Sequence, residues 1–279
     1  MKIVTWNIQW GLGLDGVVDP ARLVRHARAL GDFDILCLQE VSDNFPNLKG
    51  NDGADQFAAL ADLLPGFTPI AGPVLDIPDA AGRRKRFGNM MLSRLPVGLI
   101  LRWLLPWEAD ATPNMPRLLI EAVVEAPFGP VRVMTTHLEY SSDKLRGAQV
   151  DSIREAHRQA CAREALQRED GTGTYVRTPG TRSAILTGDF NMRPGDPTLA
   201  RIGAPIADGV PAFADAWTHL NGSAPHPFSF CLHEQLYGPP HCSDYVFVTQ
   251  DLRPRLRSIH YDLDTRLSDH QPIIVELDD

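Results

Sequence analysis

Two hydrophobic patterns alternate along the start of the chain. Apolar runs of strand length stand at residues 3–6 and 33–38, and residues 20–30 between them carry apolar side chains at helical spacing. Asp19 precedes this segment as a capping residue, and Gly31 follows it as a stop signal. The pattern therefore predicts a strand, a helix and a second strand, which is typical of a layered α/β protein.

The rest of the chain repeats these patterns. A Pro- and Gly-rich composition predicts a loop over 65–82 and a flexible loop over 168–182. Helices are predicted over 55–64 and 144–167, and strands over 87–92, 97–105, 117–124, 131–136, 184–186, 244–248, 255–261 and 273–277. Strand-type segments continue in the same style on both sides of residues 168–182, so we predict a single domain over 1–279. Strand-rich segments occur in two similar parts, which favours an α/β fold with two mixed β-sheets packed face to face and helices outside.

Composition and charge narrow the class of protein. The chain has 279 residues, 43% of them hydrophobic and 22% charged, with a formal net charge of −8 and a pI near 5.6. This is an ordinary globular composition, and it argues against nucleic-acid binding by bulk charge alone. The dense basic run at 83–86 is either a solvated loop or a patch that faces phosphate groups.

Cysteine usage and hydropathy indicate the compartment. The four cysteines have no paired spacing, so we expect buried free thiols rather than a disulfide framework or a zinc site. The chain starts without an apolar signal segment, and no run approaches the ~20 apolar residues of a membrane span. We therefore expect a cytoplasmic protein without a membrane span, and a monomer.

One stretch, residues 183–191, combines a buried strand with polar chemistry. An apolar run at 184–186 leads through Gly188 to Asp189 and Asn191. Residues two apart in an extended segment face the same way, so this carboxylate and this amide can share one pocket while Phe190 packs behind them. Such a pair suits a site that holds a water and an anion together. The alternative is that both residues only form the turn.

Polar residues recur at the ends of the other predicted strands. Layered α/β proteins place their functional sites at strand ends, so the set as a whole predicts a site. Carboxylates would hold a cation, while imidazoles and amides would donate to an anion, and phosphodiester hydrolysis needs both. The eight residues are Asn7, Glu40, His137, Asp189, Asn191, Asp244, Asp269 and His270.

Short motifs around these residues follow one another in a characteristic order. They are TWN at 5–7, LQE at 38–40, GN at 88–89, THL at 136–138, GDFN at 188–191, SDYV at 243–246 and SDH at 268–270. This order resembles the endonuclease/exonuclease/phosphatase superfamily, which includes deoxyribonuclease I, exonuclease III, inositol-polyphosphate 5-phosphatases, neutral sphingomyelinases and deadenylases. The resemblance extends from Thr5 to Val275. It implies a four-layer α/β sandwich that hydrolyses phosphate esters with Mg²⁺ or Mn²⁺.

The resemblance also implies a cation side of the site. Glu40 would be the main ligand of Mg²⁺, for which a hard carboxylate is suited. Asn7 and Asp269 would lie beside the metal, with Asp269 as a further ligand. Asn7 and Asn191 would position the metal-bound ligands and the phosphate.

An anion side is implied in the same way. Asp189 would orient the attacking water and act as its base. His137 and His270 would donate to the phosphate oxygens as charge develops in the transition state. Asp244 would hold His270 in orientation.

Parts of the chain further resemble the tyrosyl-DNA phosphodiesterase branch, which removes 5′ adducts. These parts are the segments 112–118, 136–139 and 215–217, together with Arg146 and Gln149. The chain departs from that branch at 228–231, where FSFC stands in place of the branch's later aromatic motif, and at Ser243, which replaces a basic residue before Asp244. These departures leave open whether the protein is specific for the ends of nucleic-acid strands. They do not affect the predicted hydrolysis.

The combined prediction is a divalent-metal-dependent phosphoesterase, more specifically a phosphodiesterase, with Arg117 and Asn89 contacting the substrate. A nucleic-acid substrate, DNA or RNA, is slightly favoured, through nuclease action or 5′-adduct removal. One alternative is a phosphatase or a phospholipase-type hydrolase that acts on inositol phosphate or sphingomyelin-like substrates. Another is a non-catalytic binding module, since fold does not fix function.

Overall fold

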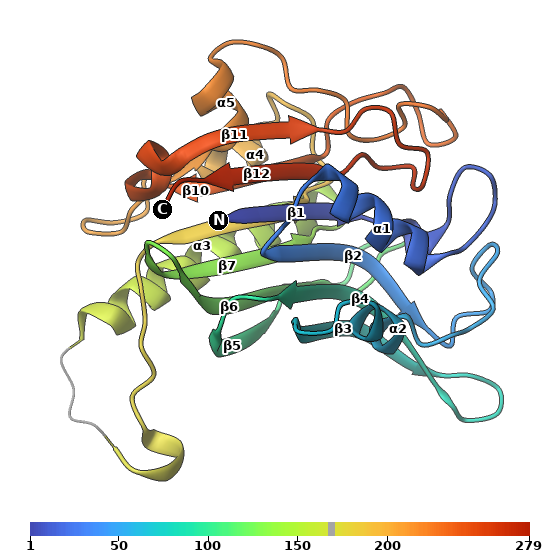
Figure 1. Ribbon diagram of the computed structural model, residues 1–279, viewed down its shortest axis with the longest axis horizontal. Coiled ribbons are helices and arrows are strands. Elements are labelled where there is room, and N and C mark those ends of the chain that lie inside the picture. Colours follow the sequence, from blue (N-terminus) through green and yellow to red (C-terminus); the bar gives the residue numbers. More distant parts are fainter. Residues whose placement is uncertain (167–170) are drawn as a thin grey trace.

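Two six-stranded sheets form the centre of the computed structural model, which describes residues 1–166 and 171–279 (Figure 1). In spatial order, the first sheet consists of β11 (Leu256–Tyr261), β12 (Ile273–Leu277), β1 (Lys2–Asn7), β2 (Ile35–Asp43), β4 (Arg84–Ser93) and β3 (Thr68–Pro78). The second consists of β5 (Val97–Leu104), β6 (Leu118–Ala126), β7 (Gly129–His137), β8 (Ala184–Asp189), β10 (Asp244–Thr249) and β9 (Phe213–Asp215). Each sheet contains one parallel pair, β1 with β2 and β7 with β8, among antiparallel neighbours. The predicted pair of mixed sheets is therefore confirmed.

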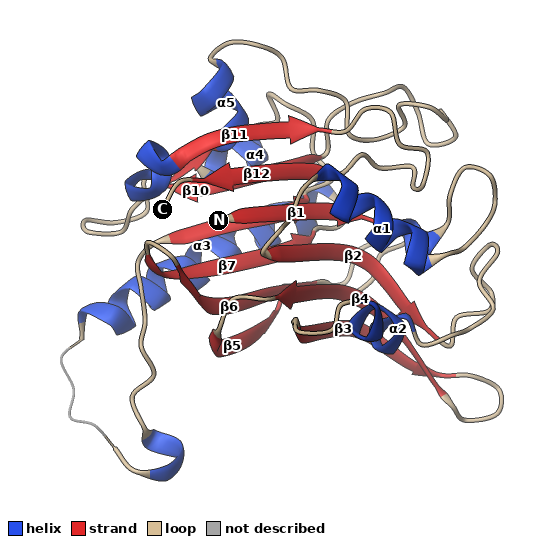
Figure 2. Ribbon diagram, in the orientation of Figure 1, coloured by secondary structure: helices blue, strands red, loops and turns tan. Residues whose placement is uncertain are grey.

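Helices cover the outer faces of the sheets (Figure 2). They are α1 (Pro20–Leu30) and α2 (Gln56–Leu63) on the first sheet, α3 (Asp143–Ala165) and α4 (Pro197–Ile202) on the second, and α5 (Ala216–Asn221) beside β11 and β9. The α1 helix begins and ends where the sequence predicts. The Asp19 carboxylate fixes its start by accepting hydrogen bonds from the first helical N–H groups. The predicted α/β sandwich is confirmed.

Side-chain alternation along the central strands builds two hydrophobic layers. Ile3 and Cys37 face the second sheet, whereas Val4, Trp6 and Leu36 pack against α1 and α2. Neighbours along a strand point to opposite faces, so strands that are buried on both sides read as continuous apolar runs. This explains why the sequence alone predicts β1 and β2.

The predicted loop over 65–82 is wrong, because most of it is strand β3. Pro69, Pro73 and Pro78 lie within β3, where a missing N–H would normally break a ladder. However, β3 is at the edge of its sheet and pairs only with β4, so a proline N can face away from the partner. The position of a strand within its sheet decides whether proline is tolerated, and the local sequence does not contain that information.

The basic run at 83–86 leads from a turn into a strand, and its arginines are paired with aspartates. Residues 84–86 are the first residues of β4, and Lys85 stacks over Phe45 with its Nζ 4.3 Å from the ring centroid. The arginines form ion pairs with Asp79 (from Arg83), with Asp76 (from Arg84), and with Asp43 and Asp55 (from Arg86). Aspartates therefore pair with the three arginines of this run, although the Arg83 and Arg84 side chains remain exposed.

The segment between α3 and β8 is only partly described. The predicted helix over 144–167 ends at Ala165, and residues 167–170 of the predicted helix and flexible loop lie outside the described residues. Residues Gly173–Tyr175 form a short 3₁₀ turn within the rest of the predicted loop. Among the described residues, no helix combines the length and the apolar character that a membrane crossing requires.

Candidate active site

The predicted site residues meet at one edge of the sandwich because strands of both sheets end there. The parallel register pairs Asn7 with Gln39 on the first sheet and His137 with Asp189 on the second. Antiparallel pairing sets the start of β10, Asp244, opposite Asp189. A hydrogen bond of 3.1 Å from Asn7 Nδ2 to Asp189 Oδ2 joins the two sheets at this edge.

Two backbone irregularities aim the side chains. A bulge between Leu38 and Val41 interrupts the pairing of β2, and Glu40 within it has a left-handed φ of 62°. Bulges re-aim side chains, and this one turns the Glu40 carboxylate toward the pocket. Gly188 has a φ of 138°, and a Cβ there would collide with the carbonyl oxygen of Thr136, so only glycine fits.

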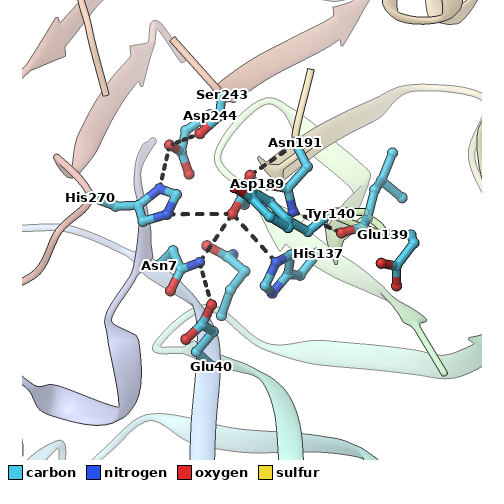
Figure 3. A network of polar contacts seen from close by, with 12 residues as sticks. Asn7, Glu40, His137, Glu139, Tyr140, Asp189, Asn191, Ser243, Asp244 and His270 are labelled. Carbon is cyan, nitrogen blue, oxygen red and sulfur yellow. Dashed lines mark hydrogen bonds and ion pairs between the residues drawn. The ribbon is translucent and has the colours of Figure 1, made fainter. Parts of the chain in front are cut away.

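Asp189 is the centre of the polar network (Figure 3). Its Oδ1 accepts a hydrogen bond of 2.9 Å from the N–H of Asn191. Its Oδ2 accepts from Asn7 and lies 3.4 Å from His137 Nε2 and 3.6 Å from His270 Nε2. Asp189 and Asn191 both line the pocket, and Phe190 behind them is fully buried, as the sequence predicts.

His270 has carboxylates on both sides of its ring. Its Nδ1 lies 2.9 Å from Asp244 Oδ2, while Nε2 faces Asp189. Burial alone would lower the pKa of His270, but the neighbouring carboxylates, Asp244 first and Asp189 next, outweigh burial and hold this pKa well above its ordinary value. His270 is therefore an imidazolium, a charged donor at the wall of the pocket.

His137, in contrast to His270, is uncharged. Burial and the nearby Arg117 guanidinium lower the pKa of His137 to about 3, against the opposing pull of Asp189. The His137 imidazole is therefore neutral. The two histidines beside the Asp189 carboxylate thus differ in protonation state because their surroundings differ.

Two carboxylates, Glu40 and Asp269, form the acidic side of the pocket. Burial and the proximity of Asp269 raise the pKa of Glu40 to about 7, and burial raises the pKa of Asp269. Gln9 Nε2 donates to Asp269 Oδ2 over 2.8 Å. Gln9 is absent from the predicted site, although its position two residues after Asn7 at a strand end is a signal that could have found it.

Asn7 joins the acidic side to Asp189. Its Nδ2 donates to Glu40 Oε1 as well as to Asp189 Oδ2, each over 3.1 Å, while its Oδ1 accepts from the N–H of Gln9. The amide oxygen is thus directed to the backbone. In this arrangement Asn7 orients Glu40 and Asp189 by donating to both.

The donor set fits a hard divalent cation at Glu40 and Asp269. Both residues are partly buried and offer carboxylate oxygens as ligands, and a cation would relieve the repulsion between their charges. Within the described part of the chain, the group of three side chains whose spacing could hold a metal ion is Asp189, Asp244 and His270, without Glu40 or Asp269. Its geometry is better explained by hydrogen bonding, since Asp244 Oδ2 already accepts from His270 Nδ1 and two serine hydroxyls.

The two predicted substrate-binding residues lie in different places. Arg117 lines the pocket, and Glu139, which is also buried, accepts from its Nε over 3.2 Å and so fixes the guanidinium. Asn89 instead donates from Nδ2 to the carbonyl of Leu118 over 3.0 Å. It lines a small side cavity of about 10 Å³ next to Arg117 and His137, outside the main pocket.

The main pocket has a volume of about 240 Å³. Seven predicted site residues line it, while Asn7 and Asp244 stand behind pocket residues. Its other walls are mainly aromatic and apolar, and sequence patterns do not distinguish such residues from core aromatics. These walls are formed by Trp10, Phe87, Met115, Tyr140, Phe230 and Tyr237. A larger cavity of about 510 Å³ between α3 and residues 177–181 contains none of the predicted site residues.

Two mixed sheets with helices outside and a polar cluster at one edge define the class of protein, an α/β sandwich with a pocket at its strand ends. The chain matches the model of the Endonuclease/Exonuclease/phosphatase family over residues 4–270, and it therefore belongs to this family, whose members hydrolyse phosphate esters. The predicted family resemblance is confirmed.

Solved structures show the same fold. A Beutenbergia cavernae endonuclease/exonuclease/phosphatase superposes with a TM-score of 0.69 at 24% identity, over 100% of this chain and 72% of that one. TDP2 of D. rerio, complexed with single-strand DNA product, gives 0.67 at 19% identity, over 100% and 99%. The mannosyl-6-phosphatase of Bacteroides thetaiotaomicron gives 0.66 at 17%, over 99% of both chains. No functionally curated protein matches the chain in sequence.

Proposed function

We propose that this protein is a divalent-metal-dependent phosphodiesterase that uses Mg²⁺, with Mn²⁺ as a substitute. The arrangement around Asp189 supports this proposal. Acceptors, Glu40 and Asp269, and donors, His270 and Arg117, line the same pocket. A site that hydrolyses a phosphate ester needs both kinds of group within reach of one water.

Each side chain has a role in this reaction. The Asp189 carboxylate orients the attacking water and accepts its proton. The His270 imidazolium and the Arg117 guanidinium donate to phosphate oxygens that gain charge in the transition state. Asp244 holds the His270 ring in place. A metal ion held by Glu40 and Asp269 would neutralise phosphate charge and polarise the ester.

The aromatic walls favour a diester with planar organic groups, such as a nucleic-acid end. Aromatic side chains stack on bases with little dependence on sequence, and Tyr140 and Tyr237 are half-exposed at the rim. The fold shared with a TDP2 that was complexed with single-strand DNA product supports nuclease action or 5′-adduct removal. We infer few contacts to distant phosphates, because ion pairs with aspartates occupy the basic run at 83–86.

A phosphatase or phospholipase-type hydrolase is the second candidate. The pocket volume of about 240 Å³ suits a small phosphate ester, such as an inositol or sugar phosphate, as well as a nucleotide end. A structural neighbour is named a mannosyl-6-phosphatase, which supports the same candidate. A non-catalytic binding module is the third candidate.

The compartment and the assembly are part of the proposal. The four cysteines are buried free thiols, as expected for a protein of a reducing compartment, and we propose a cytoplasmic monomer.

A substrate panel tests the proposal. The protein is incubated with bis-(p-nitrophenyl) phosphate, p-nitrophenyl phosphate, plasmid, single-stranded oligonucleotides, phosphoinositides and sphingomyelin, with Mg²⁺, with Mn²⁺ and with chelator. We expect metal-dependent turnover of the diester and of oligonucleotide ends, with a shallow salt dependence of oligonucleotide binding. Turnover of p-nitrophenyl phosphate or phosphoinositides alone would support the second candidate. Binding of a phosphate ester without metal-dependent turnover of any substrate would contradict both and support the binding module.

A further inference from the structure

Three donors converge on one carboxylate oxygen behind the pocket. Asp244 Oδ2 accepts from His270 Nδ1 over 2.9 Å, from Ser243 Oγ over 3.0 Å and from Ser229 Oγ over 2.7 Å. Ser229 comes from the segment 228–231, far along the chain from His270, and its side chain is fully buried. It provides the shortest of the three contacts.

Counting the hydrogen bonds of Ser229 shows which way its hydroxyl points. A hydroxyl has one proton and two acceptor positions. The backbone N–H groups of Ser243 and Asp244 donate to Ser229 Oγ over 3.0 and 3.1 Å, which fills both acceptor positions. The single proton is therefore left for Asp244 Oδ2, since the Cys242 sulfur, at 3.9 Å, is a weaker partner.

The residue after Ser229 contacts the ring that Asp244 holds. The Phe230 ring stacks on the His270 imidazole with centroids 4.4 Å apart and an interplanar angle of 29°. The backbone of the segment is tied to the same loop, because Gln271 N–H donates to the Ser229 carbonyl over 2.7 Å and Cys231 N–H donates to the Asp269 carbonyl over 3.2 Å. The segment thus contacts the Asp244–His270 pair from two directions.

We propose that Ser229 is a positioning residue that acts through Asp244 to hold the His270 ring in its working orientation. With its lone pairs occupied by backbone N–H groups, Ser229 places a fixed donor on the carboxylate, and the carboxylate in turn fixes Nδ1 of the imidazole. Phe230 restricts rotation of the ring by covering one face. This inference rests on the proposed hydrolysis only for its kinetic consequence, because the ring orientation can be measured without turnover.

A double-mutant cycle tests the route through Asp244. We expect Ser229→Ala to lower kcat roughly 10- to 100-fold, the range expected for a hydrogen bond to a charged group, and to change KM less than about twofold. In an Asp244→Asn background, the same change should have almost no further effect, because the group that Ser229 holds is already altered. Equal effects of Ser229→Ala in both backgrounds, or an unchanged kcat, would overturn the proposal.

A matched variant separates positioning from folding. Ser93→Ala removes another buried serine hydroxyl, which donates to the Leu95 carbonyl over 3.0 Å near the opposite end of β2 and β4. We expect Ser93→Ala to keep the wild-type kcat, and a kcat loss equal to that of Ser229→Ala would count against a specific role. If Ser229→Ala does not fold, Ser229→Cys, whose thiol is a weak donor and acceptor, takes its place in the cycle with the same expectations.

A spectroscopic measurement is independent of the reaction. With histidines labelled with ¹⁵N, the His270 Nδ1 proton should give a downfield signal in the wild type and in Ser93→Ala. The signal should broaden or disappear in Ser229→Ala, since the ring loses its fixed acceptor. An unchanged His270 signal in Ser229→Ala would overturn the proposal even if the kinetics changed. If the wild type turns over no phosphate ester, the proposed function fails while this signal still tests the positioning.

Discussion

Single residues in this pocket take their chemical character from their neighbours. His137 and His270 contact the same Asp189 oxygen, at 3.4 and 3.6 Å, yet one is neutral and the other charged. Arg117 stands near His137, whereas Asp244 holds the far nitrogen of His270. The pocket therefore has one imidazolium rather than two. This limits repulsion among donors, while the His270 imidazolium and the Arg117 guanidinium remain as charged donors for phosphate oxygens.

The separation of roles predicts the effect of removing the charged imidazole. We expect His270→Ala to lower kcat roughly 100- to 1,000-fold, as for the loss of one transition-state donor, because Arg117 cannot take over its position. Mg²⁺ binding, measured by calorimetry, should remain. His260→Ala, at an exposed position of β11, is the control and should keep wild-type turnover. If His270→Ala retained the wild-type rate, the assigned role would be wrong.

At the scale of elements, irregular points in regular strands set the site. The bulge in β2 turns Glu40, and the glycine in β8 allows close approach to β7 just before Asp189. Neither strand could aim these carboxylates with an uninterrupted ladder, since alternation alone would place every second residue on the same face. The irregular backbone at the strand ends thus determines where the side chains of the site point.

The long helix α3 docks on the second sheet through a buried polar contact. His157 Nδ1 accepts from the Arg132 guanidinium, and His157 Nε2 lies 2.8 Å from the Pro211 carbonyl, to which it donates. Burial, together with the Arg132 charge, lowers the pKa of His157 to about 4. The folded protein therefore keeps this imidazole neutral at pH values where an unfolded chain would protonate it.

This pKa predicts a loss of stability in mild acid. Above pH ~6.5, His157 is neutral in both the folded and the unfolded protein, and its contribution to the free energy of unfolding is complete. As the pH falls toward 4, His157 of the unfolded chain is protonated while His157 of the folded protein stays neutral, so this contribution is lost. We expect the free energy of unfolding to fall by about 3 kcal/mol more in the wild type than in His157→Gln over this range, since one pKa unit corresponds to about 1.4 kcal/mol. Urea denaturation at a series of pH values measures it. Parallel curves for the two proteins would contradict the prediction.

At the scale of the whole molecule, negative charges outnumber positive ones, and several carboxylates lie together at the pocket. The net charge is −8, the basic run is paired with aspartates, and Glu40 and Asp269 share a pocket. A cation that binds the folded protein at these carboxylates should stabilise the entire fold, because unfolding separates its ligands.

Metal-linked stability tests this view. We expect Mg²⁺ to raise the free energy of unfolding, by about 2.7 kcal/mol when its concentration is 100-fold above Kd. Glu40→Gln should shift the required Mg²⁺ concentration upward by more than about tenfold, since even an outer-shell partner commonly contributes that much to metal affinity. Glu125→Gln, an exposed change on β6, should leave the Mg²⁺ response unaltered. Thermal melts in a Mg²⁺ titration decide the matter, and identical curves for the wild type and Glu40→Gln would exclude Glu40 as a ligand.

Much of the fold was predictable because its central strands are buried on both faces. Continuous apolar runs at β1, β2 and β8, the capping signal at α1 and the apolar spacing of α2 are local properties of the chain. Strand β3 was missed because its prolines are tolerated only at an edge. The short helix α4 was missed although Asp196 and Pro197 form a capping signal, because the surrounding region is Pro-rich.

Most of the predicted site residues were chosen by their place at strand ends, and the structure brings seven of the predicted residues to one pocket. Their hydrogen-bond partners were not predicted. Gln9 follows a strand end, whereas Ser229 lies in an irregular segment whose sequence has no distinguishing pattern. The same holds for the half-exposed Tyr140 and Tyr237 of the pocket rim. A residue that acts through a hydrogen bond in a loop has no periodicity, so only its contacts reveal it.

The sequence by itself determined the alternation of strands and helices, the two-sheet architecture and the ordered motifs, because periodicity and capping depend on near neighbours along the chain. Only the tertiary structure decided that Asn7 and Asp189, 182 residues apart, hydrogen-bond across the two sheets. It alone decided the charge states of His137 and His270, since both depend on burial and on carboxylates and guanidinium groups brought in from other strands. The physical reason is that electrostatics and hydrogen bonding depend on distances in space, which a linear pattern does not contain.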